Sequence, residues 1–92
     1  MQVDVIIPAF NEQNSIGSVI RDIPKELVRD IIVVDNNSSD ETSINAENAG
    51  ATVLKQPLQG YGNACLKGIE YAKKKEEPAD VVVFLDADYS DF

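Results

Sequence analysis

The 92-residue sequence contains no histidine and only one cysteine. Without histidine it can form neither a His-based catalytic triad nor a histidine zinc site, and a single cysteine cannot form an internal disulfide. A metal ion bound by this chain must therefore be held by oxygen ligands. The lone cysteine is also compatible with a reducing, cytoplasmic environment.

Basic residues are scarce. Eight Lys and Arg stand against sixteen Asp and Glu, giving a formal net charge of −8. This balance argues against a nucleic-acid partner, because phosphate neutralisation needs clustered cations. The one basic run, Lys73–Lys75, precedes Glu76 and Glu77 and is interpreted as a solvated helix end.

Long apolar stretches are also missing. The segment Met1–Pro8 has neither the basic region nor the apolar length of a signal peptide or membrane span, so we expect the chain to start directly with structure. A composition of 43% hydrophobic and 26% charged residues predicts one small globular domain.

Four short runs rich in Val and Ile are present, at 3–7, 31–34, 51–54 and 81–85. Nearly unbroken runs of this kind are typical of strands buried on both faces of a parallel sheet. The run 81–85 is the most apolar and is expected to be the most buried.

The segments between the runs have helical patterns. Apolar residues at 16, 19, 20 and 23 define one helix that ends at Pro24. Ser38 and Glu41 have capping-box spacing before a second helix that runs to about Asn48. A third helix is expected from Tyr61 to before Pro78. Its predicted sheet-facing side consists largely of small residues, which permit close packing: Tyr61, Ala64, Cys65, Gly68, Ile69 and Ala72.

This βαβαβαβ order predicts an α/β fold, a Rossmann-like and mostly parallel sheet with right-handed crossovers. Ligands of such sheets bind beyond the carboxyl ends of the strands, at the switch point in strand order. Glu12, Asp35, Asp86 and Asp88 follow three of the predicted strands. If the first and last strands are neighbours, these acids converge on one crevice and favour a bound Mg²⁺ or Mn²⁺.

Each of these residues has a simpler interpretation when taken alone. Asp86 and Asp88 would then only solvate a turn, and Asp35 would form an Asx turn or a helix cap. Pro8 would end a strand, and Phe10 would be a core aromatic. Position at one predicted sheet edge is what favours the functional alternative.

Three ordered segments carry a resemblance to a known family. Val5–Glu12 (VIIPAFNE), Ile31–Asp40 (IIVVDNNSSD) and Phe84–Asp88 (FLDAD) together resemble family 2 glycosyltransferases of the GT-A type. The resemblance is closest to the branch that contains dolichyl- and polyprenyl-phosphate sugar synthases. It covers essentially the whole chain.

The resemblance implies an inverting glycosyltransferase with a UDP- or GDP-linked sugar donor. Pro8, Phe10, Glu12 and Asp35 would contact the base and ribose, while Asp86 and Asp88 would match the D-x-D motif and hold the Mg²⁺ or Mn²⁺. Asn63, in the loop before the third helix, is a further candidate donor contact. The implied donor-binding set is Pro8, Ala9, Phe10, Glu12, Asp35, Asn63, Asp86, Ala87 and Asp88.

The sequence departs from the family in places. Asn36 stands where the second strand frequently ends in a second Asp, which removes an acceptor charge near the ribose. Ser90 replaces a glutamine found in some polyprenyl-phosphate mannose synthases. Residues 1–92 would form the nucleotide-sugar-binding part, whereas the acceptor half and the general base are expected downstream and are absent from this chain.

We therefore expect a donor-binding part of a glycosyltransferase whose acceptor is a polyprenyl phosphate or a cell-surface glycan. The expected location is cytoplasmic, with peripheral attachment to the inner face of the membrane left open. A non-catalytic binding or scaffolding domain, self-associating through the sheet edge at 81–85, is the alternative. A sugar nucleotidyltransferase is disfavoured because Pro8–Glu12 lacks Gly, Lys and Arg.

Overall fold

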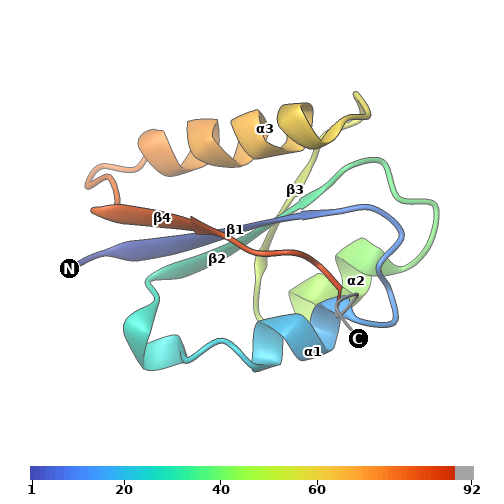
Figure 1. Cartoon of the computed structure of the whole chain (residues 1–92), viewed down its shortest axis with the longest axis horizontal. Coiled ribbons are helices and arrows are strands. Elements are labelled where there is room, and N and C mark those ends of the chain that lie inside the picture. Colours follow the sequence, from blue (N-terminus) through green and yellow to red (C-terminus); the bar gives the residue numbers. More distant parts are fainter. Residues whose placement is uncertain (89–92) are drawn as a thin grey trace.

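The computed structural model describes residues 1–88 and contains one four-stranded, fully parallel sheet (Figure 1). The strands lie in the order β3-β2-β1-β4. Their bounds are Val3–Ala9 (β1), Asp30–Asp35 (β2), Thr52–Lys55 (β3) and Val81–Phe84 (β4). The connections contain α1 (Ile16–Arg21), a 3₁₀ turn η1 (Lys25–Leu27), α2 (Thr42–Asn48) and α3 (Tyr61–Lys73).

The strand order reverses beside β1. The chain winds from β1 to β2 to β3 in one direction and then returns to place β4 on the other side of β1. Accordingly α1 and α2 cover one face of the sheet and α3 covers the other (Figure 1). The predicted Rossmann-like α/β fold is confirmed, and β1 and β4 are the neighbours whose carboxyl ends flank the switch point.

The core consists of two apolar layers on either side of the sheet. One layer joins alternate residues of β1 and β2, such as Ile7 and Val33, to Ile16 and Ile20 of α1. The other joins Ile6, Ile32 and Val34 to the small residues of α3. Because the central strands are apolar on both faces, β1 and β2 show the unbroken pattern of a buried parallel sheet.

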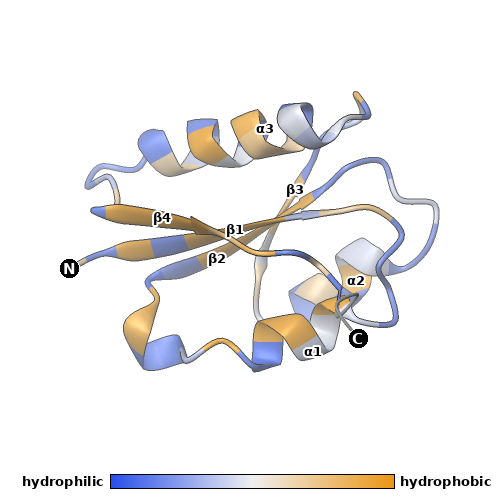
Figure 2. Cartoon of the chain, in the orientation of Figure 1, coloured by the Kyte–Doolittle hydropathy of each residue, from blue (hydrophilic) through white to orange (hydrophobic). Residues whose placement is uncertain are grey.

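The expectation that the run 81–85 would be the most buried is wrong. Every residue from Val81 to Leu85 is exposed, by between 36% and 40%. The reason is that β4 is an edge strand with β1 as its one strand neighbour among the described residues. Figure 2 shows β4 as an apolar strand at the margin of the sheet.

The predicted capping box before α2 is also wrong. The helix begins at Thr42, and the N-cap residue Glu41 makes no side-chain capping hydrogen bond. Instead, the Asp40 carboxylate accepts hydrogen bonds from the backbone N–H of Thr42, at 3.0 Å, and from the Thr42 hydroxyl. Ser38 is used elsewhere, since its backbone N–H donates to Asp35.

A charged network closes the amino end of the sheet. The side chain of Asp4 is fully buried and receives hydrogen bonds from Nε and Nη2 of Arg29, at 3.0 and 2.8 Å. Lys75 donates to Asp30 at 2.6 Å and lies 3.4 Å from Asp4. Lys75 is thus an internal ion-pair partner rather than part of the solvated helix end expected for the run 73–75.

No helix within residues 1–88 combines the length and the apolar character needed to cross a membrane. The longest described helix, α3, has 13 residues, including a charged residue in its last turn.

Stability should fall in acid because of Asp4. Burial opposes its ionisation, but Arg29 and Lys75 outweigh burial and lower the pKa of Asp4 below its ordinary value of 3.8. The network therefore stabilises the fold fully above the unfolded pKa and loses this contribution as pH falls from about 5 to about 2. In urea unfolding at several pH values, Asp4→Asn should cost about 3 kcal/mol at neutral pH and show a flatter acid dependence.

The exposed Asp80 provides the matched control, because Asp80→Asn should leave the acid dependence of wild type in place. An Asp4→Asn variant that lost stability in acid as steeply as wild type would contradict the assignment.

Gly68 should be intolerant of a methyl group. An added Cβ would lie 2.6 Å from Cγ2 of Ile6 and 3.3 Å from Cγ2 of Val34, in the layer between α3 and the sheet. Gly68→Ala should destabilise the fold by about 1–3 kcal/mol despite the better helix propensity of alanine. Gly62→Ala, on the same helix with nothing within 4 Å of the new Cβ, should be neutral or stabilising in the same denaturation assay.

Candidate donor-binding site

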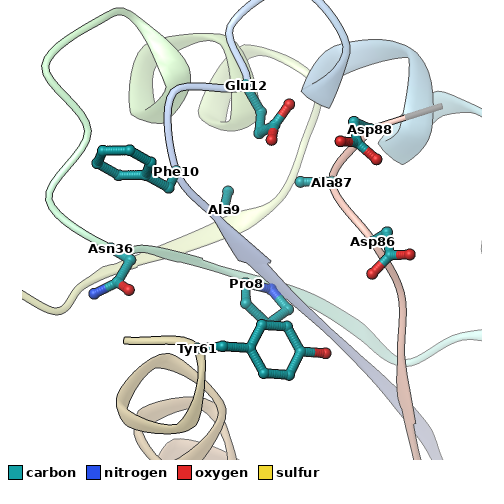
Figure 3. A pocket seen from close by; sticks show the side chains of 9 residues that line it. All are labelled: Pro8, Ala9, Phe10, Glu12, Asn36, Tyr61, Asp86, Ala87 and Asp88. Atoms are coloured by element: carbon teal, nitrogen blue, oxygen red, sulfur yellow. The ribbon is translucent and has the colours of Figure 1, made fainter. Parts of the chain in front are cut away.

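A cleft of about 360 Å³ lies at the carboxyl ends of β1 and β4, where the strand order reverses. Its volume is within the range of ordinary small-ligand pockets. Figure 3 shows the side chains that line it, which come from the end of β1, the following loop, the end of β2, the start of α3 and the turn after β4. They are Pro8, Ala9, Phe10, Glu12, Asn36, Tyr61, Asp86, Ala87 and Asp88.

The cleft contains most of the sequence-predicted site residues. Seven of the nine lining residues belong to the predicted set, and two predicted residues, Asp35 and Asn63, do not line it. The remaining two lining residues, Asn36 and Tyr61, were not in that set. Tyr61 was assigned by its helical spacing to the sheet-facing side of α3, but it begins the helix and is 63% exposed.

The turn after β4 is anchored to the start of α1. Ala87 is 5% exposed and packs in the core, so the two flanking acids, Asp86 and Asp88, are held at the cleft. The hydroxyl of Ser15 donates to the carbonyl oxygen of Ala87 at 2.8 Å and lies 3.4 Å from the Glu12 carboxylate. Ser15 was not singled out from the sequence.

Glu12 lies in an unfavourable environment for its charge. Burial and then the negative charge of Asp88 raise the pKa of Glu12, although the Ser15 hydroxyl partly offsets them. A divalent cation at the cleft would relieve this repulsion, and carboxylate oxygens are the ligands that Mg²⁺ and Mn²⁺ prefer. The carboxylate oxygens that line the cleft are therefore suitable ligands for such an ion.

The expected convergence of four carboxylates does not occur. Within residues 1–88 no three acidic or cysteine side chains are grouped closely enough to hold a metal by themselves. Asp35 is 2% exposed and turned into its own loop, outside the cleft lining. Glu12, Asp86 and Asp88 therefore line the cleft without Asp35. Asp86 and Asp88, the two acids that the motif resemblance assigns to the metal, match the number of carboxylates usually combined with substrate phosphates around Mg²⁺.

Asp35 organises the loop after β2. Its carboxylate accepts hydrogen bonds from the backbone N–H of Ser38, at 2.9 Å, and from the Ser43 hydroxyl. Burial alone would raise its pKa, but these bonds and the nearby Lys55 lower the pKa of Asp35 below its ordinary value. In this structure Asp35 makes the Asx-type turn that was its alternative interpretation, and its contact with a nucleoside stays a prediction.

The loops after β1 and β2 are joined by hydrogen bonds. The backbone N–H of Asn11, which has a positive φ of 51°, donates to the Ser38 hydroxyl at 2.9 Å. The N–H of Glu12 donates to the Thr42 hydroxyl at 2.9 Å. The Asn11 side chain in turn accepts from the N–H of Ser39 at 2.9 Å. These contacts fix the loop that carries Phe10 and Glu12.

Asn36 fixes the wall of the cleft that is formed by the loop before α3. Its amide nitrogen donates to the carbonyl oxygens of Gln56 and Leu58, at 2.9 and 2.8 Å, and its amide oxygen accepts from the N–H of Gly60 at 2.9 Å. An aspartate could not donate to two carbonyls. Asparagine rather than the family's frequent second Asp at position 36 therefore has a structural role, because Asn36 holds the loop that leads into α3.

Asn63, a predicted donor contact expected in the loop before the third helix, lies in the first turn of α3 and has a local role instead. Its side-chain amide donates to the carbonyl oxygen of Gln59 at 3.1 Å and does not line the cleft. Its contact with a donor remains a prediction. Ser90, the other departure from the family, lies outside the described residues.

Comparison with known proteins identifies the family. The sequence model described as "Glycosyl transferase family 2" matches residues 4–91. Protein RfbJ of Shigella flexneri is 40% identical over 87 residues, which cover 94% of this chain and 64% of RfbJ. This chain therefore belongs to glycosyl transferase family 2.

Solved structures give the same result for the fold. Glucosyl-3-phosphoglycerate synthase from Mycobacterium tuberculosis, in complex with Mn²⁺, UDP and glucosyl-3-phosphoglycerate, matches with a TM-score of 0.80 and 32% identity, over 94% of this chain and 33% of that one. The same enzyme in complex with Mg²⁺ and UDP matches with a TM-score of 0.79 and 33% identity, over 94% and 33% of the two chains. The fold is the Rossmann-like part of the GT-A type, and the chain spans about a third of the length of this enzyme.

Asn36→Asp should loosen the wall of the cleft. The change removes the donor to two carbonyls and places a carboxylate against them, so we expect a loss of about 2–3 kcal/mol in stability and faster hydrogen exchange at the Gly60 amide. Urea unfolding measures the stability loss, and hydrogen exchange followed by NMR measures the exchange rate of the Gly60 amide.

The control is Asn37→Asp, which makes the same chemical change at the next residue. Asn37 is exposed and has a positive φ of 69°, which aspartate also tolerates. Equal stability losses in the two variants would contradict the role assigned to Asn36.

Proposed function

We propose that this chain binds the nucleotide-diphosphate-sugar donor of an inverting, metal-dependent glycosyltransferase. The observation that carries the proposal is the cleft at the β1–β4 switch point, which gathers an aromatic side chain, Phe10, and the acids Asp86 and Asp88 at one sheet edge. Family membership supplies the reaction class, and the two M. tuberculosis enzyme complexes contain UDP. UDP- and GDP-linked sugars are the donors proposed for this chain.

The two sides of the cleft would bind different parts of the donor. Phe10 is 47% exposed at the mouth, and its ring offers a face on which a nucleobase can stack. Glu12, beside it on the same loop, would accept hydrogen bonds from the nucleoside. On the opposite side Asp86 and Asp88 would hold the cation that accompanies the diphosphate.

Asp86 and Asp88 would bind Mg²⁺ or Mn²⁺, both of which accompany UDP in the related enzyme. When bound, the ion supplies Lewis-acid stabilisation of the negative charge that develops on the departing nucleoside diphosphate. Ser15 fixes the backbone between the two acids through the Ala87 carbonyl, which keeps them pre-positioned. The cation also reconciles an anionic ligand with a chain of net charge −8.

The acceptor half and the general base are proposed to lie in sequence beyond this chain. On the basis of the motif resemblance, we propose a polyprenyl phosphate or a cell-surface glycan as acceptor and a cytoplasmic location, with peripheral contact at the inner membrane face. Residues 1–92 would accordingly bind a donor weakly and not complete a transfer by themselves.

A second candidate is a non-catalytic binding module, and the exposed edge strand favours it. Next to β4 lies an apolar hollow of about 620 Å³, bounded by Val83 and Leu85 on one side and by Val19, Ile23 and Leu27 on the other. A surface of this kind suits contact with another polypeptide, including a second copy of the chain. Nucleotide binding separates the candidates, because a module of this kind needs none.

The donor-site proposal predicts metal-dependent stabilisation by nucleotides. At about one hundred times its Kd, UDP, GDP or the corresponding nucleotide sugar should add about 2.7 kcal/mol to stability when Mn²⁺ is present, and far less in EDTA. Thermal unfolding with and without each nucleotide measures this directly. Asp88→Asn should abolish the metal-dependent part.

The control variant is Glu26→Gln, which also removes one negative charge. Glu26 lies in η1, which leads into the opposite end of the sheet, so this variant should bind nucleotides as wild type does. The proposal fails if no nucleotide stabilises the wild-type chain in a metal-dependent way.

A further inference from the structure

Tyr61 is the one aromatic side chain that α3 contributes to the cleft lining. It follows Gly60, whose φ of 133° turns the loop sharply into the helix. Figure 3 shows its ring reaching across the end of β1 near Pro8, with the hydroxyl on the side of Asp86. Tyr61 therefore lies on the wall between the nucleoside side of the cleft and its acidic side.

The environment of Tyr61 suits a hydrogen-bond donor. Cys65, one turn further along α3, then partial burial and then the Asp86 carboxylate raise the pKa of Tyr61 above its ordinary value of 10.0. A tyrosine phenol carries its hydrogen at neutral pH even at its ordinary pKa and can therefore donate a hydrogen bond. The ring is 63% exposed, so a bound ligand would cover apolar surface that now faces solvent.

The position of Tyr61 is set from the neighbouring strand. Asn36 accepts a hydrogen bond from the N–H of Gly60, the residue immediately before Tyr61, and holds the carbonyls of Gln56 and Leu58 in the same loop. The buried Asn36 amide makes three hydrogen bonds to this loop, so the loop is already ordered before a ligand binds. Binding then costs little conformational entropy in this wall of the cleft. Asn36 is thus a positioning residue for Tyr61.

We propose that Tyr61 is a donor-binding residue whose hydroxyl donates a hydrogen bond to a diphosphate oxygen of the nucleotide. This inference rests on the proposed function and adds a contact that the sequence motifs did not include. The diphosphate is the expected partner because the hydroxyl lies toward Asp86, whereas Phe10 and Asn36 occupy the other side of the cleft. The Tyr61 hydroxyl is an uncharged hydrogen-bond donor, so it can bind a phosphate oxygen. Unlike a lysine, it would not compete with the metal ion for Asp86 and Asp88.

The test is isothermal titration of the chain with UDP, UMP and uridine in the presence of Mn²⁺, and with the guanosine series in parallel. Tyr61→Phe removes the hydroxyl alone, and it should weaken diphosphate binding by about three- to tenfold while leaving uridine binding unchanged. Tyr61→Ala should weaken diphosphate binding at least as much. Because Tyr61 is exposed, both variants should unfold at the wild-type temperature without ligand.

Tyr71→Phe is the matched control, since Tyr71 is on the same helix, outside the cleft lining and next to Lys75. It should bind UDP as wild type does. Asn36→Asp should weaken the binding of uridine and of the diphosphate alike, because Asn36 itself lines the nucleoside side of the cleft.

The outcomes are distinguishable. If wild type binds UDP or GDP but Tyr61→Phe binds equally well, the role of Tyr61 is wrong and the donor-site proposal stands. A loss of the same size for uridine and for the diphosphate would overturn the diphosphate contact, because it would indicate stacking on the base instead. If wild type binds no nucleotide, both proposals fail together.

Discussion

The central constraint of this structure is that β1 has a parallel neighbour on each side. It pairs with β2 from Asp4 to Ala9 and with β4 from Val3 to Ile6, so its residues are enclosed by strands laterally and by helices above and below. Because α1 leaves the carboxyl end of β1 on one face and α3 returns to β4 on the other, the loops cannot close over this point. The cleft results from that topology, and the polar residues around it are placed by the strand ends.

Acidic side chains have opposite electrostatic environments at the two ends of the sheet. At the amino end, Asp4 and Asp30 are matched by Arg29 and Lys75 and contribute to stability. At the carboxyl end, burial and the negative charge of Asp88 raise the pKa of Glu12. The first arrangement serves folding, while the second leaves electrostatic strain that a ligand ion can remove.

The sequence predicted the fold well because its strongest features are local. Buried parallel strands are apolar on both faces, so Val and Ile runs located the four strands, and strand ends located the cleft. Burial of β4 could not be predicted, because an edge strand with the same residues looks identical to a central one until its neighbours are known. The roles of Ser38 and Asn36 were missed for a different reason: each depends on hydrogen bonds between loops that are distant in sequence.

Tyr61 illustrates the limit of periodicity. Its spacing with Ala64 and Gly68 placed it on the sheet-facing side of α3, yet Tyr61 begins the helix, is exposed and lines the cleft. Asn36 likewise was interpreted as a missing charge, whereas the amide group is what the loop requires. Composition and spacing identify which residues share an edge, but the direction of each side chain depends on the backbone of its neighbours.

The pairing of the first strand with the last also has a consequence for biosynthesis. Gln2 and Asp80 are 78 positions apart, yet they are hydrogen-bonded at the start of the β1–β4 ladder. On the ribosome, β1 can associate with β2 early, but its other edge and the carboxylate of Asp4 must wait for Lys75 and β4 to emerge. The nascent chain thus carries a half-paired central strand until β4 has emerged, and the cleft cannot form before the turn after β4 is available.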